Sequence, residues 1–181
     1  QDMIRHHQQA VEMATIELYG GSDPQVQSLA YDILTSQTNQ IGQMQSWLTR
    51  WDYPLDNPDE AMAWMQGHSD GRGHGGSTES SMSMGPRAPG SPPMPGMATT
   101  EEMTKLRTLQ GAELDTFFLQ LMLRHHQGGS EMMEFARHPG ADTSGTTGGS
   151  SGWTGVDPPQ ERKRKEFVEQ QRQLLAKHQP G

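Results

Sequence analysis

The sequence predicts an all-α protein, a ferritin-like four-helix bundle made of two helical hairpins. Four long segments carry apolar residues at helical steps of three and four, Gly or Asp-Pro pairs separate them, and one motif occurs twice. We expect a single domain over residues 1–181, built from duplicated hairpins at 1–66 and 99–181. A flexible Gly/Pro/Met-rich crossover over 67–98 would join them, and a flexible loop would cover 139–157.

The first hairpin follows from two amphipathic segments. Residues 1–19 form a helix that ends at Gly20-Gly21, a usual stop signal. Its inner stripe is Met3, His7, Ala10, Ala14 and Leu18. Asp23-Pro24 then predicts an N-cap with proline in the first turn. The helix that follows has the clearest stripe of the chain, which consists of Val26, Leu29, Ala30, Ile33, Leu34, Gln37, Ile41, Met44, Leu48 and Trp51.

The second hairpin begins at a capping-box pattern, Thr99-x-x-Glu102. A short helix to Leu109 and a break near Gly111 precede a longer helix over about Ala112–Arg137. The inner stripe of the longer helix is Leu114, Phe118, Leu119, Met122, His126, Gly129 and Met133.

Two further helices are predicted by Pro-containing starts. Asn57-Pro58 would open a short helix through Met65, and Asp157-Pro158 would open the last helix of the chain. The last helix has a thinner stripe than the others, consisting of Phe167, Val168, Gln171, Leu174 and Leu175.

Composition excludes several classes of protein and of site. The 181 residues contain no cysteine, which excludes disulfides, thiolate metal sites and a thiol nucleophile. The net charge of −8 argues against nucleic-acid binding, which needs a concentrated basic face. No apolar run is long enough to span a bilayer. Because helical periodicity starts at Gln1 without a cap, we expect a trimmed chain whose precursor carries an export signal, with a lipid anchor as one option.

A duplicated motif is the main functional signal. Met3-Ile4-Arg5-His6-His7-Gln8 recurs as Met122-Leu123-Arg124-His125-His126-Gln127, an offset of 122 − 3 = 119 residues. The same offset relates Glu12-Met13 to Glu131-Met132. A surface helix has no packing need for two consecutive imidazoles, so two copies of this pair predict a shared role.

Helical spacing pairs thioethers with imidazoles in both copies of the motif. The pairs are Met3 with His7, His6 with Met13, Met122 with His126, and His125 with Met132. Thioethers select Cu(I), and imidazole also suits copper. The motif therefore predicts a copper site, with silver as a mimic of Cu(I) and Met44 of the second helix as an additional ligand.

An alternative without metal is open for the same residues. Methionine at helical spacing commonly fills gaps in a core, and a histidine on an apolar stripe is often a hydrogen-bonded interior residue. His7 and His126 lie on the inner stripes, where Gln37, Gln171 or Asp115 would be partners. His6 and His125 lie outside these stripes, which favours them as ligands. The paired Arg and Glu residues of the motif would form an interhelical salt-bridge set, consisting of Arg5, Arg124, Glu12 and Glu131.

The crossover carries further soft ligands in a polar setting where no core accounts for them. They are His68, His74, Met82, Met84, Met94 and Met97. In Met94-Pro95-Gly96-Met97 two thioethers are close enough in sequence for one short loop to grip an ion. This composition predicts metal capture by the crossover as well.

Three other segments accompany the repeat: Gln37-x-x-Gln40-Ile41-x-x-Met44-x-x-Trp47-Leu48, Met94-Pro95-Gly96-Met97 and Gly111-Ala112-Glu113-Leu114-Asp115. With the paired His-His motifs, they resemble the bacterial domain-of-unknown-function 305 (DUF305) family, which includes the CopM-like copper-binding proteins. The resemblance implies a ferritin-like bundle that is secreted, periplasmic or attached to the cell envelope. The chain departs from the family pattern at Gly128-Gly129-Ser130, where small apolar residues are expected.

The leading functional hypothesis is an extracytoplasmic copper sequestrant. The alternative is a non-catalytic interaction or stress protein in which the His-His motifs are structural. A ferritin-like di-metal oxidase would need two Glu-x-x-His motifs and further inward carboxylates. The chain contains no Glu-x-x-His, so we expect a protein that is not an enzyme.

Overall fold

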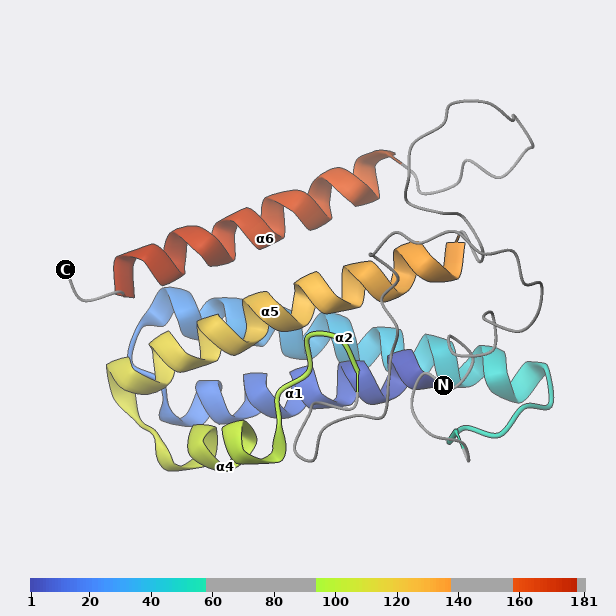
Figure 1. The fold of residues 1–181 in the computed structure, drawn as a ribbon, viewed down its shortest axis with the longest axis horizontal. Helices are drawn as coiled ribbons and strands as arrows, with labels where there is room; N and C mark the ends of the chain where they lie inside the picture. Colours follow the sequence, from blue (N-terminus) through green and yellow to red (C-terminus); the bar gives the residue numbers. More distant parts are fainter. Residues whose placement is uncertain (58–93, 138–157, 179–181) are drawn as a thin grey trace, which may run out of the picture.

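A computed structural model of the protein describes residues 1–57, 94–137 and 158–178. These residues form five helices and no strand: α1 (Asp2–Gly20), α2 (Pro24–Arg50), α4 (Thr100–Thr108), α5 (Gly111–Arg137) and α6 (Pro158–His178) (Figure 1). The all-helical prediction is confirmed. The short helix expected from Asn57 through Met65 and the crossover ligands His68, His74, Met82 and Met84 lie outside the described residues.

The helices pack as two hairpins joined through α1 and α5. α1 lies against α2, α5 lies against α6, and α1 also lies against α5. The short α4 contacts both α1 and α5 (Figure 1). The two copies of the duplicated motif are therefore on the two helices at the centre of this arrangement, where they face each other.

Helix ends follow the predicted capping signals. The Asp23 side chain accepts a hydrogen bond from the Gln25 backbone amide at 2.6 Å, which caps α2. At the start of α4, Thr99 Oγ1 accepts from the Glu102 amide at 3.1 Å, and the Glu102 carboxylate accepts from the Thr99 amide at 2.9 Å. These reciprocal bonds form the predicted capping box.

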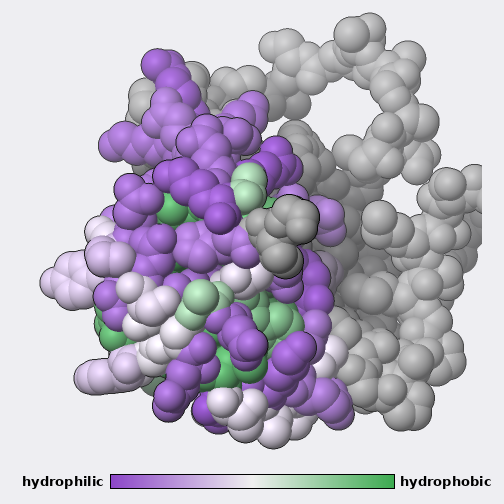
Figure 2. All heavy atoms as spheres, turned by 90° about the vertical axis from the view of Figure 1, so that its left-hand side faces the viewer, coloured by the Kyte–Doolittle hydropathy of each residue, from purple (hydrophilic) through white to green (hydrophobic). Residues whose placement is uncertain are grey.

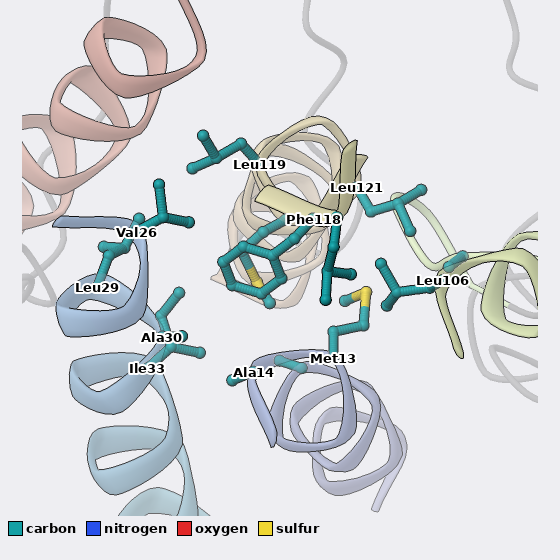
Figure 3. Packing of buried hydrophobic residues seen from close by; sticks show 14 of the residues in the cluster. Met13, Ala14, Val26, Leu29, Ala30, Ile33, Leu106, Phe118, Leu119 and Leu121 are labelled. Carbon is teal, nitrogen blue, oxygen red and sulfur yellow. The ribbon is translucent and has the colours of Figure 1, made fainter. Parts of the chain in front are cut away.

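Phe118 of α5 lies at the centre of the apolar core (Figure 3). Met13 of α1 points toward Leu106 of α4, with Phe118 beside them (Figure 3). The predicted stripe of α5 is confirmed up to Met122, but it ends on Met132 rather than on Met133, which is 43% exposed. Met132 packs with Met94 and Met97, so the segment that carries these two residues determines which side of α5 is buried at this end.

The second half of α2 is less buried than its stripe predicted. Trp51 is 64% exposed and stacks on Trp47 with ring centroids 6.5 Å apart, and Met44 and Leu48 are only partly buried. α2 extends past the start of α1 (Figure 1), so the partner helix is too short to cover its end. The inner position predicted for Trp51 is therefore wrong.

Hydrophilic residues dominate the end of the molecule at the turn between α1 and α2, with small apolar areas between them (Figure 2). Within the part of the chain that the structure describes, no helix has the length and apolar character that crossing a membrane requires.

Candidate metal site

Two histidines from the two copies of the motif meet at the contact between α1 and α5. The rings of His6 and His125 stack with centroids 3.7 Å apart and an interplanar angle of 30°. His6 is 3% exposed and His125 is fully buried, so the prediction that both lie outside the inner stripes is wrong. The buried face of α1 runs through residues 6, 10, 13 and 17, which is rotated by about one residue from the expected stripe.

The stacked histidines have nitrogens that the protein leaves without partners. Nε2 of His6 and both ring nitrogens of His125 are buried and accept or donate no hydrogen bond. Burial, with smaller effects of His7 and His126, lowers the pKa of His6 to about 4. Burial, followed by His6 and His126, lowers the pKa of His125 to about 2. Both rings are thus neutral at pH 7, and a neutral imidazole offers a lone pair to a metal ion.

The second histidine of each motif copy has a side-chain hydrogen-bond partner, although Nδ1 of His7 is also buried without one. His7 Nε2 donates to Gln40 Oε1 at 2.7 Å. Gln37 Nε2 donates to His126 Nε2 at 3.1 Å, and His126 Nδ1 donates to Gln171 Oε1 at 3.1 Å. The expected pairing with Gln37 and Gln171 is confirmed for His126.

Four methionine side chains form a separate apolar group, which we call the thioether cluster. Its members are Met3 of α1, Met94 and Met97 of the crossover, and Met132 of α5. Met94 is 1% exposed and Met97 is 6% exposed, so the end of the segment predicted as a flexible linker is buried and ordered. The apolar side chains of this turn pack against α5, which composition alone did not indicate.

Two consecutive glycines of α5, Gly128 and Gly129, allow two groups to approach the helix closely. One is the turn that carries Met94 and Met97, and the other is the His6 ring. A Cβ atom at Gly128 would clash with the carbonyl oxygen of Pro95, and one at Gly129 would lie 2.8 Å from Cε1 of His6. The Pro95 backbone carbonyl also lies close enough to the His6 ring to oppose the lowering of the pKa of His6. The thioether cluster and the stacked histidines therefore adjoin. The lack of a side chain at these two glycines is what allows both close approaches.

Several predicted ligands lie elsewhere. Met13 and Met122 are fully buried in the main apolar core, separate from the thioether cluster. Met44 is partly buried on α2 and belongs to neither group. The structure therefore does not bring the proposed Met13 and Met122 partners of His6 and His126 into the thioether cluster.

The expected salt-bridge set of the motif is also rearranged. Glu12 pairs with Arg107 of α4, and Arg124 pairs with Glu102 of α4. Arg5 donates to the backbone carbonyl of Asn57 at 3.3 Å. Two of these residues do form interhelical ion pairs, but their partners are on α4 rather than on the other copy of the motif.

A buried pair of acids was missed by sequence reasoning. Glu17 of α1 and Asp115 of α5 are both fully buried. Asp115 accepts hydrogen bonds from the Ser22 amide at 2.8 Å, the Ser22 hydroxyl at 2.7 Å and the Asp23 amide at 3.0 Å, so it is not the partner of His7 or His126. These bonds lower the pKa of Asp115 although burial opposes its ionisation.

Glu17 titrates in the opposite direction from its neighbour. Burial, followed by a hydrogen bond with Asp115 and by the charges of Asp115 and Asp23, raises the pKa of Glu17 to about 8. The only sequence signal was the spacing of Glu17, which lies at helical steps of four, three and four from His6 through Ala10 and Met13.

The chemistry of the site is soft. Thioethers with neutral imidazoles suit Cu(I), whereas carboxylate-rich sites suit magnesium, calcium or manganese. Among residues 1–57, 94–137 and 158–178, no three His, Asp or Glu side chains form a group that could hold a metal ion. Any metal held here would depend on methionine sulfur.

The comparisons with known proteins agree on one family. The model of the family described as "Domain of unknown function (DUF305)" matches residues 1–145. A solved structure described as a putative secreted DUF305 protein from Streptomyces coelicolor is 33% identical to this chain, with a TM-score of 0.61. The match covers 98% of this chain and 85% of that protein. No curated protein matches the sequence.

Two other solved structures are similar to this chain. A DUF305 fragment from Deinococcus radiodurans is 28% identical, with a TM-score of 0.52 and coverage of 97% of this chain and 87% of that one. CopM in its Cu(I)-bound form is 19% identical, with a TM-score of 0.50 and coverage of 97% and 86%. At that identity, the likeness to CopM shows the fold alone.

Proposed function

The chain belongs to the DUF305 family, and we propose that its function is to bind monovalent copper between the thioether cluster and the stacked pair His6 and His125. One observation carries the proposal: four methionine side chains from three parts of the chain gather beside buried imidazole nitrogens that have no hydrogen-bond partner. Packing alone accounts for buried methionine, but a buried polar atom without a partner is costly and calls for a ligand.

The donor set supports Cu(I) over harder ions. Thioether sulfur is uncharged and polarisable, and it binds Cu(I) in preference to ions that favour oxygen. The neutral state of both imidazoles means that no proton has to leave before a metal binds. Ag(I) has the same preference for soft donors and serves as a redox-inert probe.

We infer a binding role rather than an enzymatic one. The acids that a di-metal oxidase would need are distant from the histidines, because Glu17 lies three helical turns from His6 on α1, about 16 Å along the axis. A sequestrant requires only that the ion be held and kept from water, and the burial of Met94, Met97 and Met132 is suited to that.

We also infer that the protein acts outside the cytoplasm and that its two hairpins make a ferritin-like bundle. The similarity to a protein described as secreted supports export. The packing of α1 on α2, α5 on α6 and α1 on α5 supports the bundle. The Cu(I)-bound state of CopM supports copper as the cargo.

The test is an anaerobic titration with Cu(I) against bicinchoninate, and in parallel with Ag(I). The triple variant Met94→Leu/Met97→Leu/Met132→Leu keeps the volume of the cluster but removes its sulfurs. We expect this variant to bind Cu(I) at least about tenfold more weakly than the parent protein. The matched control is Met13→Leu, which removes a core sulfur and should bind as the parent does. Equal affinity of parent and triple variant would contradict the proposal and favour a structural role for the His-His motifs.

A further inference from the structure

The turn that carries Met94 and Met97 is held on α1 by one side chain that is not a ligand. Gln9 Nε2 donates to the Ala98 carbonyl at 2.9 Å, and the Ala98 amide donates to Gln9 Oε1 at 2.7 Å. The primary amide thus satisfies both backbone groups of the residue directly after the turn. Such a two-bond contact fixes the position and the orientation of the backbone together.

On the other side, the turn is held by α5. Arg124 Nη2 donates to the carbonyl of Met97 at 3.4 Å. The same guanidinium donates from Nη1 and Nη2 to the Glu102 carboxylate at 2.8 and 2.5 Å, so its direction is fixed by a bidentate ion pair. Glu102 is itself fixed because it completes the capping box with Thr99.

The duplicated motif accounts for why these positions are involved. Gln9 and Gly128 occupy equivalent places in the two copies, since 128 − 9 = 119. Gln9 grips the turn, whereas Gly128 makes room for its Pro95 carbonyl. Gly96 has a φ of 78°, which lets the turn follow the surface of α5. The two copies differ at this position, and both residues found there contact the same turn.

We propose that Gln9 and Arg124 are positioning residues for copper binding. They hold the turn between α1 and α5 so that the sulfurs of Met94 and Met97 stay beside His6. Neither side chain belongs to the ligand set, but the affinity for Cu(I) depends on both because a loose turn would lose entropy on binding. This inference rests on the function proposed above. It assigns to Arg124 a role in holding the turn, in addition to its ion pair with Glu102.

The test measures Cu(I) affinity against bicinchoninate for Gln9→Ala and Arg124→Lys in the full chain. Lysine keeps the charge but has no planar fork, so it cannot hold Glu102 and the Met97 carbonyl in one geometry. We expect each variant to bind Cu(I) about tenfold more weakly, the loss expected from one or two hydrogen bonds. The matched controls are Gln8→Ala, which changes an exposed neighbour on α1, and Arg107→Lys, which changes an exposed ion pair with Glu12. Both controls should bind as the parent does.

A second measurement separates positioning from general stability. In the Met94→Leu/Met97→Leu background, Gln9→Ala and Arg124→Lys should cause no additional loss of Cu(I) affinity, because the turn no longer carries sulfur. An equal loss in both backgrounds would overturn the positioning role. The positioning role would also be overturned if Gln9→Ala and Arg124→Lys bound Cu(I) as tightly as the parent while Met94→Leu/Met97→Leu bound it weakly. In that case the proposed function would still stand. Equal affinity of the parent and Met94→Leu/Met97→Leu would overturn this inference at its root, and the triple variant would separately decide the proposed function.

Discussion

Replacing Glu17 by glutamine should stabilise the protein at pH 7 and leave its stability at pH 4 unchanged. Glu17 is fully buried against Asp115, and its pKa is raised from the ordinary value of 4.5 to about 8. Its protonation therefore stabilises the fold fully below pH 4.5, and this stabilisation is lost as the pH rises through 8. The groups that face it are Asp115 from α5 and Asp23 from the turn after α1, and Asp23 in turn lies 3.2 Å from His178 of α6.

The magnitude follows from the difference between the folded and unfolded states. At pH 7 the unfolded chain has lost the Glu17 proton that the folded chain retains. This pH lies 7 − 4.5 = 2.5 units above the ordinary pKa of the group. At roughly 1.36 kcal/mol per unit, this proton uptake costs up to about 3 kcal/mol of folding free energy. Glutamine is neutral in both states, so the cost disappears in Glu17→Gln.

Urea unfolding followed by far-UV circular dichroism at pH 4, 5.5, 7 and 8 would measure this effect. The free energy of unfolding of the parent should fall between pH 4.5 and 8, and that of Glu17→Gln should be flatter by up to about 3 kcal/mol at pH 7. Glu113→Gln, which changes an exposed acid on α5, should keep the parental slope. A Glu17→Gln variant that is less stable than the parent at pH 7, or has the same slope, would refute the buried-acid reasoning.

Three other changes test the packing around the site. Gly128→Ala should displace the turn with Met94 and Met97, because its Cβ would clash with Pro95, and should therefore weaken Cu(I) binding. Gly42 has open space around it on α2, so Gly42→Ala should instead raise the free energy of unfolding by about 0.5–1 kcal/mol. Met13→Leu should change that free energy by less than about 1.5 kcal/mol in urea titrations, since it conserves volume in the core. Phe118→Ala should lower it by about 3–5 kcal/mol because it empties the centre of the core, and a loss below about 1 kcal/mol would contradict the packing in Figure 3.

The helices and their ends could be predicted from local sequence. Asp23-Pro24, the Thr99 capping box and the Gly20-Gly21 stop act within a few residues, so their outcome depends little on the rest of the fold. The duplicated motif was also visible as a repeat, and the structure brings the first histidine of each copy, His6 and His125, together.

Which face of each helix is buried was harder to predict. His6 and His7 are adjacent, and a rotation of α1 by one residue decides which of them enters the core. Periodicity was judged from apolar residues, whereas the true inner face of α1 also carries His6 and Glu17. Charged residues are rarely fully buried, so the burial of Glu17 follows only from its position beside Asp115 of α5, which is distant in sequence.

The position of the turn at the end of the crossover could not be predicted from the sequence. Met94 and Met97 lie in a Gly- and Pro-rich stretch without periodicity, and their burial depends on Gly128 and Gln9, which are distant in sequence. A glycine inside a helix signals a close approach, but it does not identify the segment that approaches.

X-ray absorption at the copper edge of the Cu(I)-loaded protein tests the central claim most directly, because it reports the atoms bound to the metal. The account predicts a shell of sulfur with imidazole nitrogen, and a lower sulfur contribution in Met94→Leu/Met97→Leu/Met132→Leu but not in Met13→Leu. A shell of oxygen and nitrogen alone, or the same sulfur contribution in all three proteins, would contradict it.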